Sequence, residues 1–210
     1  MSRRDALLAE MGLAPVWRLR SKGKNPRDLW IELKRAVPAC TACGLHKTRK
    51  QTVLGVGDEH ADWLLIGEAP GAEEDRLGEP FVGQAGRLLD NMLAAIGLKR
   101  GENVYIANVL KCRPPGNRNP QPEEVQKCAP HLMRQIELIE PKLIVAMGRV
   151  AAQALLNSDA SIASLRGRLH RYAGVPLIVT YHPAYLLRNL PDKAKAWADL
   201  VFARNTMAGL

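Results

Sequence analysis

Short apolar runs alternate with amphipathic segments from about residue 60 to the C-terminus. The runs are rich in branched aliphatic residues and are bounded by Gly, Pro or Asn, which is typical of buried parallel strands. They cover residues 62–67, 103–108, 142–148 and 176–182. Segments with helical spacing lie between them, at residues 83–98, 122–139 and 149–157. This alternation predicts an α/β fold with a parallel sheet.

Chemically distinctive residues follow three of the predicted strands. Glu68 comes directly after the first strand, Asn108 ends the second, and His182 ends the fourth. Phe81 belongs to the Gly- and Pro-rich segment that follows Glu68. Because parallel strands present their carboxyl ends at one edge of the sheet, where ligands bind, we expect these side chains to share one pocket.

Each of these residues also has an ordinary structural interpretation. The Asn108 amide could read the edge of a planar heterocycle, but an Asn at a strand end is commonly a turn residue. His182 could stabilise negative charge on a leaving group, and Phe81 could stack on a base, or both could be structural. The sequence GEAPG at 67–71 lacks the lysine and Ser/Thr of a phosphate-binding P-loop. Recurrence after separate strands favours a pocket over coincidence.

The N-terminal segment is basic. Residues 1–36 hold nine Lys and Arg against four Asp and Glu, a net +5, and we expect them to form an extension with a short helix. Its role is either that of a solvated linker or that of an additional arm that contacts phosphates. Residues 37–210 are expected to form one globular domain.

The net charge and the hydropathy of the whole chain indicate which partners and which cellular compartment suit it. A net charge of +9 and a pI near 9.7 suit a polyanionic partner such as nucleic acid. The apolar runs are far shorter than the ~20 residues of a membrane span, and the N-terminus is a poor signal peptide. We therefore expect a cytoplasmic protein without a membrane partner.

Four cysteines are arranged as Cys40-x2-Cys43, then 68 residues to Cys112, then 15 residues to Cys128. In a reducing compartment such cysteines are more often metal ligands or catalytic groups than disulfides. Four thiolates suit either tetrahedral zinc or a cubane iron–sulfur cluster. Zinc sites usually pair two short knuckles, so the long second spacing slightly favours a cluster; unrelated buried thiols are the third alternative.

Three motifs, together with the four cysteines, resemble those of the family 4 uracil-DNA glycosylases, bacterial and archaeal enzymes with a [4Fe–4S] cluster. The motifs are GEAPGAEEDRLGEPFVGQAGRLLDNML, NVLKCRPPGNRNPQPEE and HPAYLLR, and the resemblance extends over residues 37–205. It implies a three-layer α/β/α sandwich around a four-stranded parallel sheet. It also implies hydrolysis of the bond between uracil and deoxyribose in DNA, which leaves an abasic site for base excision repair, by an enzyme we expect to be monomeric.

The resemblance assigns roles to the predicted pocket. Phe81 would stack on the flipped uracil, Asn108 would hydrogen-bond its polar edge, and His182 would stabilise negative charge on the leaving base. Glu68 would orient the substrate or the attacking water. Glu74 would crowd the base near its C5 atom and so help to reject thymine.

The sequence also departs from relatives within the superfamily. Part of the superfamily carries a water-activating aspartate after the first-loop polar residue, and this chain has Ala69 there. The general base is therefore unassigned, and hydrolysis must depend more on His182 and on Glu68 or another carboxylate. The basic loop that marks uracil-retaining members is absent after Asn108.

The implied cofactor and DNA contacts complete the expectation. Flipping a base vacates the stack, which an apolar wedge with a cation can occupy. The cluster would be structural, because uracil release transfers no electrons, and would hold the loop between Asn108 and Cys128 beside the DNA. The cluster ligands would be Cys40, Cys43, Cys112 and Cys128, and the DNA contacts Leu186, Leu187, Arg188, Arg113 and Arg118.

Two other classes of protein remain open from the residues alone. One is a zinc protein that binds nucleic acid through its basic surface without a pocket, and the other is a redox protein. An absorption band near ~400 nm with bound iron and sulfide distinguishes a cluster from zinc.

Overall fold

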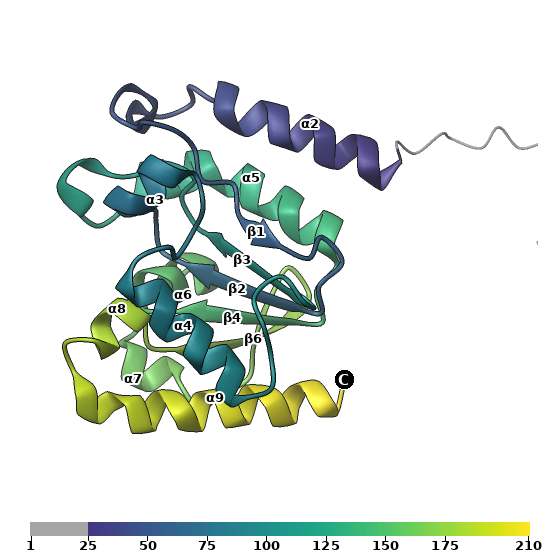
Figure 1. The fold of residues 1–210 in the computed structure, drawn as a ribbon, viewed down its shortest axis with the longest axis vertical. Coiled ribbons are helices and arrows are strands. Elements are labelled where there is room, and N and C mark those ends of the chain that lie inside the picture. The colour runs from purple at the N-terminus through teal and green to yellow at the C-terminus, as the bar shows by residue number, and fades with distance from the viewer. Residues whose placement is uncertain (1–24) are drawn as a thin grey trace, which may run out of the picture.

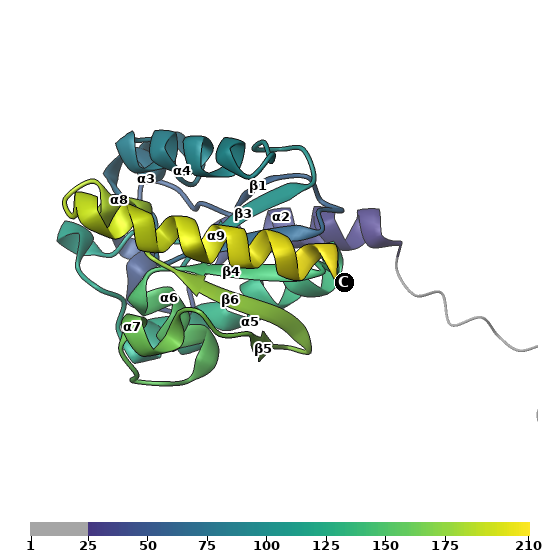
Figure 2. The ribbon, with the colours of Figure 1, turned by 90° about the horizontal axis from the view of Figure 1, so that it is seen from below.

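The computed structural model describes residues 25–210. The helix predicted near the N-terminus, and most of the basic extension, lie outside the described residues. Six strands of the described part form one sheet in the order β1-β3-β2-β4-β6-β5 (Figure 1; β5 is labelled in Figure 2). Their bounds are Val56–Gly57 (β1), Trp63–Gly67 (β2), Val104–Asn108 (β3), Leu143–Met147 (β4), His170–Tyr172 (β5) and Val175–Thr180 (β6).

The four predicted parallel strands are confirmed as β2, β3, β4 and β6, which pair in parallel with one another. The expected total of four strands was wrong, because β1 and β5 add an antiparallel strand at each edge. β1 has two residues and β5 has three, so neither is long enough to show an alternating pattern in the sequence.

Eight α-helices are described. Their bounds are Pro26–Ala39 (α2), Ala72–Leu77 (α3), Gln84–Ala95 (α4), Pro122–Ile139 (α5), Arg149–Leu156 (α6), Ile162–Leu165 (α7), Pro183–Leu186 (α8) and Lys193–Ala208 (α9). Short 3-10 turns cover Gly44–Lys47, Pro115–Asn117 and Leu190–Asp192. The three helices predicted between strands are present as α4, α5 and α6. α5 begins as expected from its proline and acidic residues, since Glu124 accepts the Gln121 N–H at 2.8 Å.

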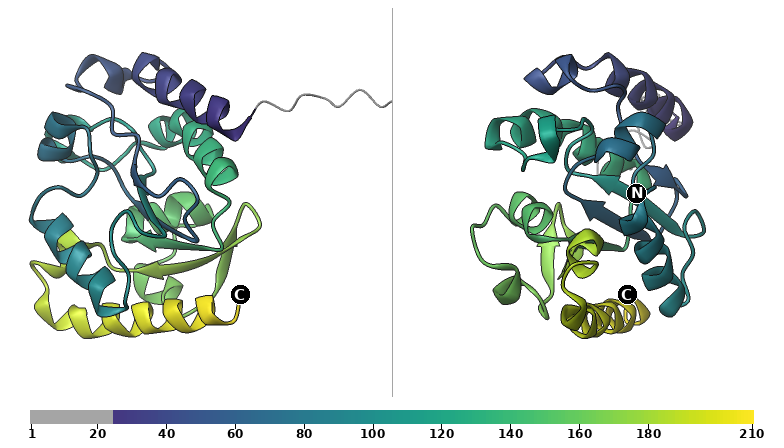
Figure 3. Two further views of the ribbon diagram at one scale, coloured as in Figure 1. Left: turned by 45° about the vertical axis from the view of Figure 1, so that its right-hand side comes forward. Right: turned by 60° about the vertical axis from the view of Figure 1, so that its left-hand side comes forward.

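Side chains alternate along the strands and so build two cores. In β2, Leu64 and Ile66 face the layer of α2, α5 and α6, whereas Trp63 and Leu65 face the layer of α4 and α9. α2 and α9 lie on opposite sides of the molecule in both views of Figure 3, and α9 crosses one face of the sheet in Figure 2. The predicted three-layer α/β/α arrangement is therefore confirmed.

α2 connects the N-terminal region to the domain. It is one continuous helix that buries Trp30, Leu33 and Val37 in the same core as α5. Burial of side chains of this size contributes about 1.5–3 kcal/mol each. The expected boundary at residue 36 falls inside this helix. No helix within residues 25–210 is both long and apolar enough to cross a membrane.

Candidate active site

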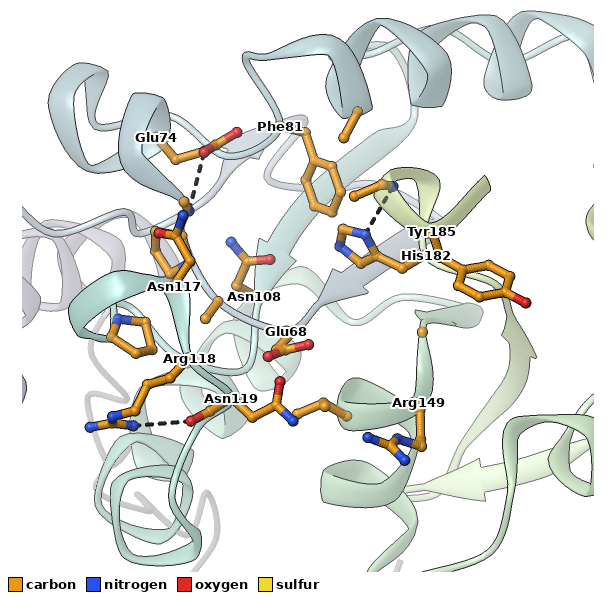
Figure 4. Close-up of a pocket in the computed structure, with 18 of the residues that line it drawn as sticks. Glu68, Glu74, Phe81, Asn108, Asn117, Arg118, Asn119, Arg149, His182 and Tyr185 are labelled. Carbon is orange, nitrogen blue, oxygen red and sulfur yellow. Dashed lines mark hydrogen bonds between the residues drawn. The ribbon is translucent and has the colours of Figure 1, made fainter. Parts of the chain in front are cut away.

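A cavity of about 750 Å³ opens where the parallel strands end (Figure 4). Loops after β2, β3, β4 and β6 line it together with the segment between α3 and α4. Glu68, Glu74, Phe81, Asn108 and His182 all line this one cavity. The structure thus brings together side chains that are spread over more than a hundred residues of the chain.

Asn108 ends β3 and is buried, with 2% of its surface exposed. Its Oδ1 atom is inaccessible to solvent and accepts no hydrogen bond from the described residues. The neighbouring strand contributes Gly67, which pairs with Asn108 in the sheet register. A Cβ atom on Gly67 would overlap Oδ1 of Asn108 and would lie 2.7 Å from Cζ of Phe81. Glycine therefore leaves room for both side chains at the pocket floor.

An unsatisfied buried oxygen costs about 1–3 kcal/mol, so such an atom usually has a partner in the functional state. Asn108 lies among the residues that line the cavity in Figure 4, although solvent does not reach its Oδ1 atom. A ligand N–H group that reaches this atom at the pocket floor would satisfy it.

Phe81 and His182 form one wall of the pocket. Their rings stack with centroids 5.4 Å apart and an interplanar angle of 29°. Ala184 donates its backbone N–H to Nδ1 of His182 at 3.1 Å, so the proton of the neutral ring is on Nε2. Burial, helped by the positive charge of Arg188, lowers the pKa of His182 to about 4. At neutral pH this ring is an uncharged hydrogen-bond donor toward the cavity.

The two carboxylates of the pocket are held differently. Glu74 accepts the N–H of Gly71 at 3.1 Å with one oxygen and the N–H of Val82 at 3.2 Å with the other. The Glu68 carboxylate makes no hydrogen bond to the described part of the chain, although the backbone oxygen of Glu68 accepts the Leu110 N–H at 3.1 Å. Burial raises the pKa of its carboxyl group, and nearby Arg149 opposes that rise. Glu68 is therefore free to accept a proton or to orient a water, whereas Glu74 supports the main chain.

Comparison with known proteins decides the family. Residues 54–201 match the model of the uracil DNA glycosylase superfamily. A type-4 uracil-DNA glycosylase of Archaeoglobus fulgidus is 49% identical over 164 residues, which cover 74% of this chain and 82% of that protein. One from Thermotoga maritima is 47% identical, over 80% of this chain and 88% of its own. A type-5 enzyme of Pyrobaculum aerophilum is more distant, at 32% identity over 62% of this chain and 64% of its own.

The chain belongs to the type-4 uracil-DNA glycosylases.

All four cysteines of this glycosylase line a second cavity, beside α2 and the start of α5. Cys40 directly follows α2 and Cys43 precedes a 3-10 turn, while Cys112 and Cys128 are 7% and 8% exposed. No three His, Cys, Asp or Glu side chains of residues 25–210 are placed to hold a single metal ion. A [4Fe–4S] cluster has four separate irons, so its ligands attach at separate corners.

The surroundings of these thiols suit a negatively charged group. Arg49, Lys111 and Lys127 line the cavity, and none of its lining residues is acidic. Arg49 donates to Sγ of Cys112 at 3.0 Å, and the Lys111 backbone N–H donates to Sγ of Cys128 at 3.3 Å. A [4Fe–4S] cluster with four thiolates is an anion, and hydrogen bonds to its sulfurs are a normal feature of such sites. The residues present therefore fit the cluster.

Lys111 has a position that adds to this fit. Its side chain is 1% exposed, and its ammonium group donates to the backbone oxygen of Asn108 at 2.8 Å. No carboxylate among the described residues pairs with it. A buried cation is costly without a counterion, and an anionic cluster in the adjoining cavity would supply one.

The predicted DNA-contacting leucines differ in exposure. Leu186 is 1% exposed and packs into the core beside α4 and α9, so it cannot serve as a wedge in this arrangement. Leu187 is 38% exposed and Leu190 60% exposed. The motif could not separate the two adjacent leucines, because the α8 turn decides which of them faces inward. Arg188 is exposed at the pocket mouth.

The two arginines of the loop after β3 already have partners. Arg118 makes hydrogen bonds of 2.9 and 2.6 Å to the two carboxylate oxygens of Glu124, and Arg113 donates to Asn117 at 2.7 Å. Arg118 is exposed and Arg113 half-buried. Contact with phosphate would require Arg118 to share or exchange its carboxylate partner.

Sequence reasoning missed some pocket residues. Arg149 follows the third parallel strand, β4, and applying the strand-end rule to all four strands would have found it. Tyr185 was within a recognised motif; it stacks on Tyr181 at 5.1 Å and donates to Asp192 at 2.6 Å. Asn117 belongs to the loop between Cys112 and Cys128, and it gave no separate signal.

Proposed function

We propose that this glycosylase holds flipped uracil through the Asn108 amide. Uracil presents an N3–H donor beside the O4 acceptor, and Oδ1 and Nδ2 of Asn108 complement this pair. The observation that carries the proposal is the buried Oδ1 atom with no partner in the described protein. Cytosine presents the opposite pattern at this edge and would leave unpaired groups in the pocket.

Phe81 and His182 complete the base site in this proposal. The Phe81 ring stacks on the uracil, and the Nε2–H of His182 donates to uracil O2, where negative charge develops as the glycosidic bond breaks. A neutral donor is suited to this task because it stabilises the departing uracil anion without a charge to be desolvated first.

We propose that Glu68 orients the attacking water. It is the pocket carboxylate without a hydrogen bond to residues 25–210, and burial holds its pKa above the ordinary value. Glu74 fits a supporting task better than direct contact with the base, since both of its oxygens accept backbone N–H groups. Ala69 offers no acid–base group, so Glu68 takes over orientation of the nucleophile.

On the DNA side, we propose that Leu187 and Leu190 form the wedge and that Arg188 contacts the backbone. The support is the exposure of both leucines and their closeness in sequence to Arg188, which lines the pocket. Arg113 and Arg118 remain proposed phosphate contacts. Both leucines would fill the gap that the flipped nucleotide leaves in the stack.

We further propose that Cys40, Cys43, Cys112 and Cys128 ligate a [4Fe–4S] cluster. When bound, it cross-links α2, the loop after β3 and the start of α5, and it contributes no electrons to uracil release. Its ligands need a reducing compartment, which supports a cytoplasmic location. A monomeric enzyme remains our proposal, and the packing of α2 supports a domain that begins before residue 36.

Excision is tested with a duplex oligonucleotide that contains one uracil opposite guanine, cleaved by alkali after incubation. Strand scission at the uracil is expected, with none in the matched cytosine or thymine duplex. Folded, iron-loaded protein that yields no scission would contradict the function. Repetition opposite adenine and in a single strand gives the preferred context.

Cys128→Ser should lower the bound iron and the soluble fraction before it alters the pocket itself. The hydroxyl is a poorer ligand than the thiolate, so one corner of the cluster is lost. Iron and sulfide content and the absorption near ~400 nm measure the outcome. Full stability and activity of a cluster-free variant would contradict the structural role.

Lys111→Met should weaken retention of the cluster, because it removes a buried positive charge beside the cysteine cavity while keeping a similar shape. We expect faster loss of absorbance near ~400 nm on exposure to an iron chelator. Lys127→Met is the matched control, since Lys127 lines the same cavity but is partly exposed and pairs with Glu123 at 2.6 Å. Equal loss rates in the two variants would refute this role of Lys111.

A further inference from the structure

The stacking residue Phe81 has an unusual backbone conformation. Its φ angle is +56°, in the left-handed region that bulky side chains rarely occupy. Only 7% of its surface is exposed, and its ring is fixed between Gly67 and His182. A residue in such a conformation needs surrounding contacts that hold it there.

Arg100 supplies the contacts to the backbone carbonyls of this segment. Its Nη1 donates to the oxygen of Pro80 and its Nη2 to the oxygen of Phe81, each at 3.0 Å. Its Nε donates to Asp90 of α4 at 2.8 Å, which fixes the plane of the guanidinium. The Arg100 side chain is 24% exposed, so its ion pair with Asp90 is partly protected from solvent.

The other sides of the same peptides are also fixed. Glu74 accepts the N–H of Val82, the residue after Phe81, at 3.2 Å. Gly86, in the first turn of α4, lies so close that a Cβ atom there would overlap the carbonyl oxygen of Phe81. The peptide of Phe81 is thus held between Gly86, at the start of α4, and Arg100, which lies beyond the end of the same helix.

We propose that Arg100 is a positioning residue that sets the Phe81 ring for stacking on uracil. It lies outside the residues that line the pocket, and it acts only through the backbone of residues 80 and 81. Two parallel N–H donors aimed at consecutive carbonyls require the planar guanidinium, so lysine cannot replace both bonds. This inference rests on the proposed stacking role of Phe81.

A double-mutant cycle tests the proposal, with single-turnover excision as the measurement. Arg100→Met should slow excision about 10-fold, because a small displacement of a positioning group carries a large rate penalty. The same change in a Phe81→Ala background should alter the rate less than about 2-fold, since the ring it positions is gone. Arg100→Lys should recover only part of the loss. Arg134→Met, which removes an exposed pair with Glu137, is the control and should change little.

Different results would refute the positioning role of Arg100 and the stacking role of Phe81. Equal slowing by Arg100→Met in both backgrounds, or no slowing in the parent, overturns the positioning role. No effect of Phe81→Ala alone overturns the stacking role instead. If Arg100→Met does not fold, Asp90→Asn replaces it, because it loosens the guanidinium while leaving both carbonyl bonds. We expect about 2- to 3-fold slowing in the parent and none in the Phe81→Ala background.

Discussion

Asn108→Ala should slow uracil excision by about 100- to 1000-fold while the protein keeps its affinity for DNA. The change removes both hydrogen bonds to the flipped base, each worth about 1–3 kcal/mol in a buried site. Affinity for DNA comes mainly from contacts to phosphate, which this substitution leaves in place. Single-turnover kinetics on a uracil-containing duplex and anisotropy titration with abasic product DNA measure the two quantities.

The control is Asn117→Ala, in an exposed residue of the same pocket mouth. It should leave the rate within several-fold of the parent value. A parallel fall in rate and DNA affinity in Asn108→Ala would show a structural role at the end of β3. Thermal unfolding separates that outcome from a local loss of the base contact.

His182→Ala should lower the single-turnover rate by about 100- to 1000-fold, the usual effect of removing one donor to a developing anion. It also removes the acceptor for the Ala184 N–H at the start of α8, which costs about 1 kcal/mol of stability. His182→Gln, which can still donate from a similar position, should recover part of the rate. A rate equal to that of the parent would rule out leaving-group stabilisation by His182.

The low pKa of His182 has a definite pH signature. Burial brings it to about 4, below the 6.5 of an exposed histidine, so the unfolded chain takes up this proton first as the pH falls. The contribution of His182 to stability is complete above about pH 6.5 and is lost as the pH falls toward 4. Urea unfolding should show that the free energy of unfolding falls more between pH 7.5 and pH 5 for the parent than for His182→Gln. Within this range the His182 ring should stay neutral in the folded enzyme and add no inflection to the rate.

The longer strands of the sheet could be predicted from the sequence, whereas the short edge strands could not. β2, β3, β4 and β6 are buried on both faces and therefore appear as continuous apolar runs. The short edges β1 and β5 have no such pattern and form only because a neighbouring strand offers unpaired backbone groups. α9 also gave no clear signal, because its apolar residues are spread around the helix instead of forming one stripe.

Some pocket residues could likewise be predicted from the sequence, whereas the orientation of others could not. The positions of Glu68, Phe81, Asn108 and His182 follow from the rule that parallel strands end at one edge, and the motifs added Glu74. Which of Leu186 and Leu187 reaches solvent depends on the direction of one helical turn.

By itself, the sequence determined the α/β class, the parallel strands, the edge where the site forms and the residue types that gather there. These depend on local patterns of burial and on chain direction, which the order of residues specifies. Only the tertiary structure decided that the buried oxygen of Asn108 has no partner among residues 25–210, that Glu74 supports the main chain, and that Arg100 holds Phe81. Such facts depend on contacts between segments far apart in the chain, where differences of an ångström decide whether a group is paired or free.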